Sequence, residues 1–172
     1  MNSPTIRGLT RFARRPQVAF GGVYGTILAS TMVAALTQYP PPVQEDRLYD
    51  ATWLMITVVA AAIAHGYSHI LADRGEEGHP RGYGAFTRTL LDEWPMVVFA
   101  LPTALLLFGA GVGWWESQGI EYVAFVTNIV LLFAWGLLTN WSAGRGPRSA
   151  LLTATADAFL GVLVVILNAL VK

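Results

Sequence analysis

Only three readily ionisable side chains lie inside the long apolar segments of this 172-residue chain: His65, His69 and Asp157. A charge in hydrocarbon costs free energy, so ionisable residues inside a membrane span usually serve a function. His65 and His69 are four residues apart, and on a helix both rings therefore project from one face, one turn apart. These three residues are the first candidates for a functional site.

Two imidazoles in this arrangement suit several kinds of chemistry. They can bind one metal ion, pass a proton between them, or each find a separate hydrogen-bond partner. With Asp157 as a carboxylate, the set suits Zn²⁺ or Fe²⁺ and leaves a coordination position open. The alternative is structural, because membrane bundles also use polar side chains to join helices.

Asp157 lies at the same predicted depth as His65. Each is seven residues from the predicted cytoplasmic end of its span, roughly 10 Å at 1.5 Å per residue. We therefore expect Asp157 to pair with His65 if the second and fifth spans are neighbours. Thr153 and Asn168 extend a polar stripe on the fifth span, and Tyr67 and Ser68 lie between the histidines. All seven residues are predicted to line one ion or proton pathway.

The elements that must position these residues are membrane-spanning helices. The chain is 54% hydrophobic and only 13% charged, and its charges cluster between apolar runs of the length that crosses a bilayer. This pattern predicts an all-α, polytopic membrane protein of one domain, residues 1–172. The five expected spans cover about 18–38, 51–72, 94–115, 122–141 and 150–171.

The basic residues predict the orientation of the chain. Four arginines precede the first span, three lie between the second and third, and two lie between the fourth and fifth. The opposite side holds only Arg47 and Lys172. The positive-inside rule therefore places the N-terminus inside and the C-terminus outside, as in a bacterial plasma (inner) membrane protein.

The segment before the first span has two interpretations. Apolar residues recur there at helical spacing between arginines, which suits a short interfacial helix that binds lipid headgroups. The other interpretation is a frayed basic tail that only sets the topology. The arginines concerned are Arg7, Arg11, Arg14 and Arg15.

Small residues at spacings of four predict close helix packing. Such residues let backbones approach one another where no hydrophobic effect drives association. The first span carries Gly21, Gly25 and Ala29, and the third carries Gly109 and Gly113. Because five helices are few to enclose a pathway, we also expect a homo-oligomer.

Composition and motifs narrow the function. Zero net charge gives no electrostatic case for nucleic acid, and the lack of cysteine excludes thiolate metal sites and Cys nucleophiles. The chain has no phosphate-binding glycine loop, HExxH motif or serine nucleophile elbow, so an enzyme is not the favoured interpretation.

Three hypotheses follow for the function. The preferred one is an ion channel or transporter, either proton-conducting or proton-coupled, that uses His65, His69 and Asp157. The second is a metal-binding transporter or membrane-embedded enzyme that uses the same three residues. The third is a structural or assembly subunit of a larger membrane complex.

Overall fold

The protein is described by a computed structural model over residues 16–36, 46–73 and 83–171. Five of its helices are long and apolar enough to cross a membrane, as predicted. They are α2 (Pro16–Leu36), α3 (Asp46–Asp73), α5 (Trp94–Gly111), α6 (Ile120–Ser142) and α7 (Pro147–Val171). A shorter helix, α4 (Tyr83–Asp92), leads directly into α5. Arg7, Arg11, Arg14 and Arg15, with the predicted interfacial helix, lie outside the described residues.

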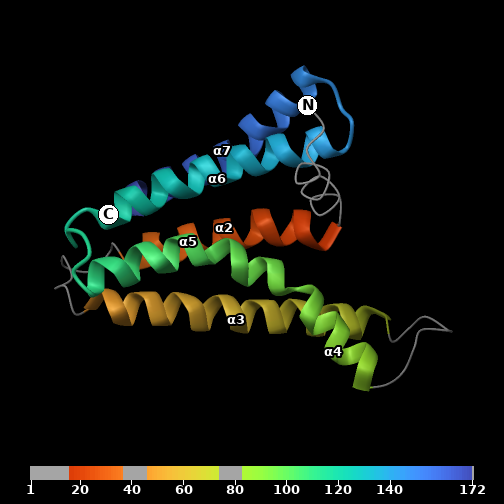
Figure 1. Cartoon of the computed structure of the whole chain (residues 1–172), viewed down its shortest axis with the longest axis horizontal. Helices are drawn as coiled ribbons and strands as arrows, with labels where there is room; N and C mark the ends of the chain where they lie inside the picture. The colour runs from red at the N-terminus through yellow and green to blue at the C-terminus, as the bar shows by residue number, and fades with distance from the viewer. Residues whose placement is uncertain (1–15, 37–45, 74–82, 172) are drawn as a thin grey trace.

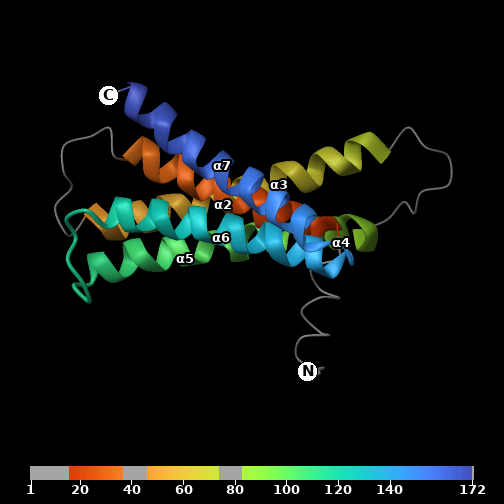
Figure 2. The ribbon, with the colours of Figure 1, turned by 90° about the horizontal axis from the view of Figure 1, so that it is seen from above.

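The helices form a bundle in which α2 and α5 are central (Figure 1). Helices α6 and α7 pack closely together on one side, and α3 lies on the other side against α5. Figure 2 shows the same bundle from above, with α7 crossing over α2. Helix α2 contacts α5, α6, α7 and α3, so it joins the two halves of the bundle.

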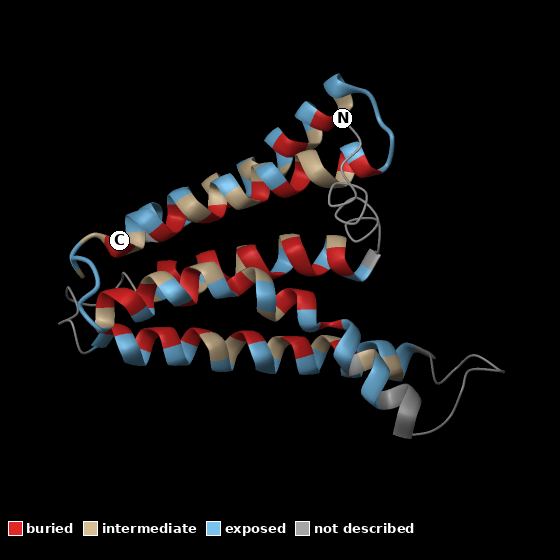
Figure 3. Cartoon of the chain, viewed as in Figure 1, coloured by how far each residue is buried: buried red, intermediate tan, exposed pale blue. Residues whose placement is uncertain are grey.

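Two buried stripes hold α3 against α5 (Figure 3). On α3, buried residues recur at helical spacing, which marks one face turned inward. On α5, buried residues recur in the same way. The α3 stripe contains Ala51, Leu54, Val58 and Ala62, and the α5 stripe contains Met96, Ala100, Ala104 and Leu107. Both stripes run toward the end of the bundle where α3 ends and α5 begins.

The glycines of α2 bring its backbone against the start of α5. A Cβ added at Gly21 would meet Pro95 Cβ and Met96 N at 2.8 Å. A Cβ added at Gly25 would clash with the carbonyl oxygen of Met96. Ala29, one turn further, is fully buried. These residues therefore occupy a tight α2–α5 contact.

The two glycines singled out on the third span have other surroundings. Gly109 lies against the ring of Trp115, whose indole N–H donates to the Leu106 carbonyl at 2.9 Å. Gly113 follows the end of α5 with φ of 78°, a backbone conformation that favours glycine. Gly113 thus serves a turn and lies on no helix face.

Polar side chains join the helices within the core. Thr103 of α5 donates to the side-chain carbonyl of Asn128 on α6 at 2.8 Å, and both residues are fully buried. The indole of Trp135 on α6 donates to the Ala19 carbonyl of α2 at 3.2 Å. These bonds fix α6 against both central helices.

A buried arginine anchors the beginning of α3. Arg47 is 3% exposed, and its guanidinium lies 2.8 Å from Glu121 of α6 and 3.6 Å from Asp50. It also donates to the Ser117 carbonyl at 3.2 Å. Because a buried charge requires compensation, this network ties α3 to the α5–α6 connection and the start of α6.

The α2–α5 approach gives a direct test of the fold. Gly25→Ala places a methyl group against the Met96 backbone, so we expect it to lower unfolding stability by about 1–3 kcal/mol. Gly146→Ala is the matched control, because a Cβ there meets nothing within 4 Å. Thermal unfolding of both variants in detergent measures the difference. Equal stability of the two would contradict the packing.

Candidate metal-binding site

Glu93 lies where the α3 and α5 stripes end. It precedes the first turn of α5 as the N-cap residue, yet its side chain makes no capping hydrogen bond. The carboxylate instead reaches α3, where Oε2 lies 3.0 Å from Nδ1 of His65 and Oε1 lies 4.0 Å from Nε2 of His69. Glu93 continues the inward stripe of α5, and the histidines continue that of α3.

The three side chains differ in exposure. The Glu93 side chain is only 6% exposed, His65 is 27% exposed, and His69 is 54% exposed. The ring of Phe20, from α2, stacks on His65 with centroids 4.5 Å apart and planes 16° apart. This contact covers one face of the imidazole and restricts its rotation.

The contact between His65 and Glu93 is close. Nδ1 of His65 is buried, and Oε2 of Glu93 lies 3.0 Å away, within the distance of an ion pair. The two atoms are also as close as two ligands of one cation would be.

Such convergence is the arrangement that metal ligands need. The ligand atoms of His65, His69 and Glu93 all lie within 4.8 Å of one another. Two ligands each about 2.1 Å from one ion are separated by about 3.0–3.4 Å at octahedral or tetrahedral angles. The His65–Glu93 separation already meets this requirement, and His69 needs to move closer by up to about 1.4 Å.

The cluster opens into a cleft of about 480 Å³. Gln17 and Phe20 come from α2, the histidines from α3, and Thr89, Asp92 and Glu93 from α4 and the start of α5. The cleft thus lies at the end of the bundle where α2 and α5 begin. The two histidines of α3 and Glu93 before α5 all line this space.

Asp157 is elsewhere in the bundle. Its carboxylate lies against α6, where a Cβ added at Gly136 would meet Oδ2 at 2.6 Å. Helix α7 packs on α6 and α2, whereas α3 packs mainly on α5 (Figure 1). The expected His65–Asp157 pair is therefore replaced by His65–Glu93. His65 and Asp157 have the same predicted depth, but α2 and α5 lie between the helices that carry them.

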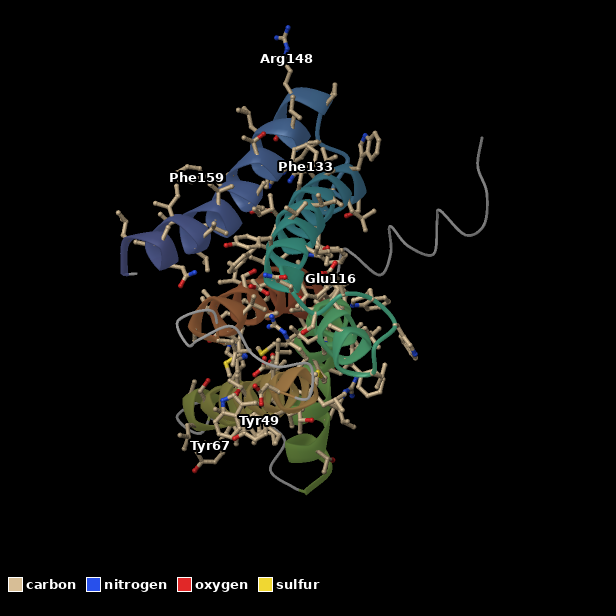
Figure 4. The ribbon with its side chains drawn as sticks, turned by 90° about the vertical axis from the view of Figure 1, so that its left-hand side faces the viewer. Tyr49, Tyr67, Glu116, Phe133, Arg148 and Phe159 are labelled. Carbon is tan, nitrogen blue, oxygen red and sulfur yellow. The ribbon has the colours of Figure 1, made fainter. Side chains whose placement is uncertain are left out.

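The other predicted pathway residues are also dispersed. Tyr67 projects from α3 away from the bundle (Figure 4) and is 44% exposed. The Ser68 hydroxyl donates to the His65 carbonyl of its own helix at 2.7 Å. Thr153 and Asn168 are half-buried on α7 with Asp157. None of these residues lines the cleft beside the histidines.

Glu93 is the site residue that sequence reasoning did not assign. The sequence Glu93-Trp94-Pro95 suggests a helix start, and a capping role alone accounts for a carboxylate there. One signal was available: Glu93 flanks the start of its predicted span, and His69 lies near the end of the preceding one. Both therefore belong to the same membrane boundary.

No protein-family model, curated protein or solved structure matches this chain.

Proposed function

We propose that this protein is an integral membrane protein that binds a divalent first-row transition metal ion, such as Zn²⁺ or Fe²⁺. His65, His69 and Glu93 would be the ligands. Imidazole nitrogen and carboxylate oxygen are common ligands of these ions. Among residues 16–36, 46–73 and 83–171, these three form the one group of at least three side chains with metal-binding spacing.

The observation that carries this proposal is the convergence of both histidines on one buried carboxylate: Nδ1 of His65 lies 3.0 Å from Oε2 of Glu93, and Nε2 of His69 lies 4.0 Å from Oε1. A buried carboxylate costs free energy unless positive charge compensates it. A cation between the nitrogen and the oxygen would satisfy both atoms and neutralise the buried carboxylate of Glu93. The His69 ring, whose centroid is 4.6 Å from that of His65, supplies the third ligand from the same helix face.

Metal binding is tested with Co²⁺, which gives a visible absorption band when nitrogen and oxygen ligands replace water. We expect the purified, untagged protein to bind one Co²⁺ per chain in competition with Zn²⁺. Glu93→Gln and His65→Ala should each weaken binding by about tenfold or more, since each removes one of three ligands.

Asp157→Asn is the control for this experiment. It removes a carboxylate that lies against α6, away from the cluster. Its Co²⁺ affinity should equal that of the unmodified protein. Equal binding by Glu93→Gln would contradict the proposed ligand set.

We place the cleft at the cytoplasmic face. This orientation follows from the positive-inside rule. In the sequence, nine basic residues flank the span ends on the side of the cleft, and two flank the opposite ends. The ion would then come from the cytoplasm, and the Arg47 network would lie on the outer side.

The orientation is tested by labelling single cysteines, because the chain contains none. Gln118→Cys and Gly146→Cys place a thiol at opposite ends of the bundle, at exposed positions, without changing any charge. A membrane-impermeant maleimide added to intact spheroplasts should label the thiol at position 118. The thiol at position 146 should react only after permeabilisation. The reverse pattern would invert the topology.

Proton passage is the second candidate function. The 3.0 Å His65–Glu93 contact favours it, because imidazole and carboxylate groups exchange protons readily. It ranks second because fully buried apolar side chains fill the α3–α5 interface beyond the cluster, namely Leu54, Val58 and Met96.

Proton flux into liposomes distinguishes the two candidates. If protons pass through the cluster, His65→Ala and Glu93→Gln should each reduce pH-driven flux at least several-fold. Asp157→Asn tests in the same assay whether α7 belongs to the path. Flux that is unchanged in all three variants would exclude proton passage through these residues.

A further inference from the structure

Two consecutive carboxylates line the cleft but differ in their exposure to water. Asp92 ends α4 and is exposed, whereas Glu93 is 5% exposed and carries the contacts to the histidines. The helix breaks between them, since Asp92 is the last residue of α4 and Trp94 the first of α5. Both side chains line the same cleft, the exposed Asp92 and the buried Glu93.

The inner carboxylate is poorly accessible to a hydrated ion. A divalent ion in water carries a full hydration shell, and it must exchange those waters for protein ligands before it reaches Glu93. The stacked ring of Phe20 covers one face of His65 and lines the same cleft. Asp92 lines the same cleft as the buried ligands and is exposed, so a hydrated ion that enters the cleft can meet it first.

We propose that Asp92 is an entry ligand for the divalent cation. It would attract the hydrated ion from solution and hold it before transfer to His65, His69 and Glu93. This inference rests on the proposed metal-binding function and adds a loading step to it. It also assigns separate roles to two adjacent carboxylates, capture to the exposed one and retention to the buried one.

The chemistry of the cleft supports this separation. Nδ1 of His65 and Oε2 of the buried Glu93 lie 3.0 Å apart, so a cation at this part of the cleft would meet two ligand atoms. Gln17 and Thr89 add neutral oxygen atoms to the lining, so Asp92 is the exposed anionic group in the cleft. Arg88, one turn earlier on α4, is exposed and does not line it.

An exposed charge affects association rates more than dissociation rates. A carboxylate at the mouth of a cleft raises the local concentration of cations, and salt screens this effect. An inner ligand instead holds the bound ion and determines how fast it leaves. The two roles are therefore separable by kinetics.

The test is stopped-flow binding of Co²⁺ to the full-length protein in detergent, at low and high ionic strength. Asp92→Asn should reduce the association rate constant about threefold or more and make it less dependent on salt. The dissociation rate constant, measured by displacement with a chelator, should change by less than about twofold. Asp92→Glu should restore fast association.

Glu116→Gln is the matched control. It removes one exposed carboxylate from the connection between α5 and α6, which lies at the opposite end of the bundle from α4 (Figure 1). Its association rate should equal that of the unmodified protein. Equal association rates for Asp92→Asn and Glu116→Gln would overturn the entry role.

The other outcomes separate failure of the entry role of Asp92 from failure of metal binding itself. If Asp92→Asn accelerates dissociation and leaves association unchanged, Asp92 is a resident ligand and the entry role is wrong. If Asp92→Asn has no effect while Glu93→Gln abolishes binding, this inference fails and the proposed function stands. If the unmodified protein binds no Co²⁺, the proposed function itself fails.

Discussion

The packing of α3 against α5 controls the position of the candidate site. In a bilayer, helices do not gain from the hydrophobic effect by leaving lipid, so close side-chain packing and polar contacts must hold them together. Here the apolar stripes of both helices belong to one buried cluster, α3 packs on α5, and Arg47 anchors the beginning of α3 through Glu121. The register of this contact brings the histidines of α3 level with Glu93 at the start of α5.

The same contact explains why the cluster lies at one end of the bundle. A carboxylate that is 5% exposed carries a large desolvation cost unless a cation or strong donors compensate it. At the start of α5, Glu93 meets two imidazoles and lies beside an open cleft. An ion can therefore reach the carboxylate from solution. Deeper in the α3–α5 interface, fully buried leucine, valine and methionine leave no comparable access.

The two halves of the bundle hold different polar groups. The α3–α5 half contains the His–His–Glu cluster, whereas the α6–α7 half contains Asp157 against the backbone at Gly136. Helix α2 lies between them and touches both halves. Its small residues contact α5, and Phe20 stacks on His65, so α2 supports the candidate site without supplying a ligand.

The sequence by itself determined the five apolar helices, because length and hydropathy are local properties that the bilayer imposes on each segment separately. It also identified His65 and His69 as one pair, because helical periodicity places them on one face. Only the tertiary structure decided which carboxylate they meet. Asp157 matched them in depth, but depth does not determine which helices are neighbours. Adjacency depends on how all five helices pack together, and the packing of α3 on α5 selected Glu93.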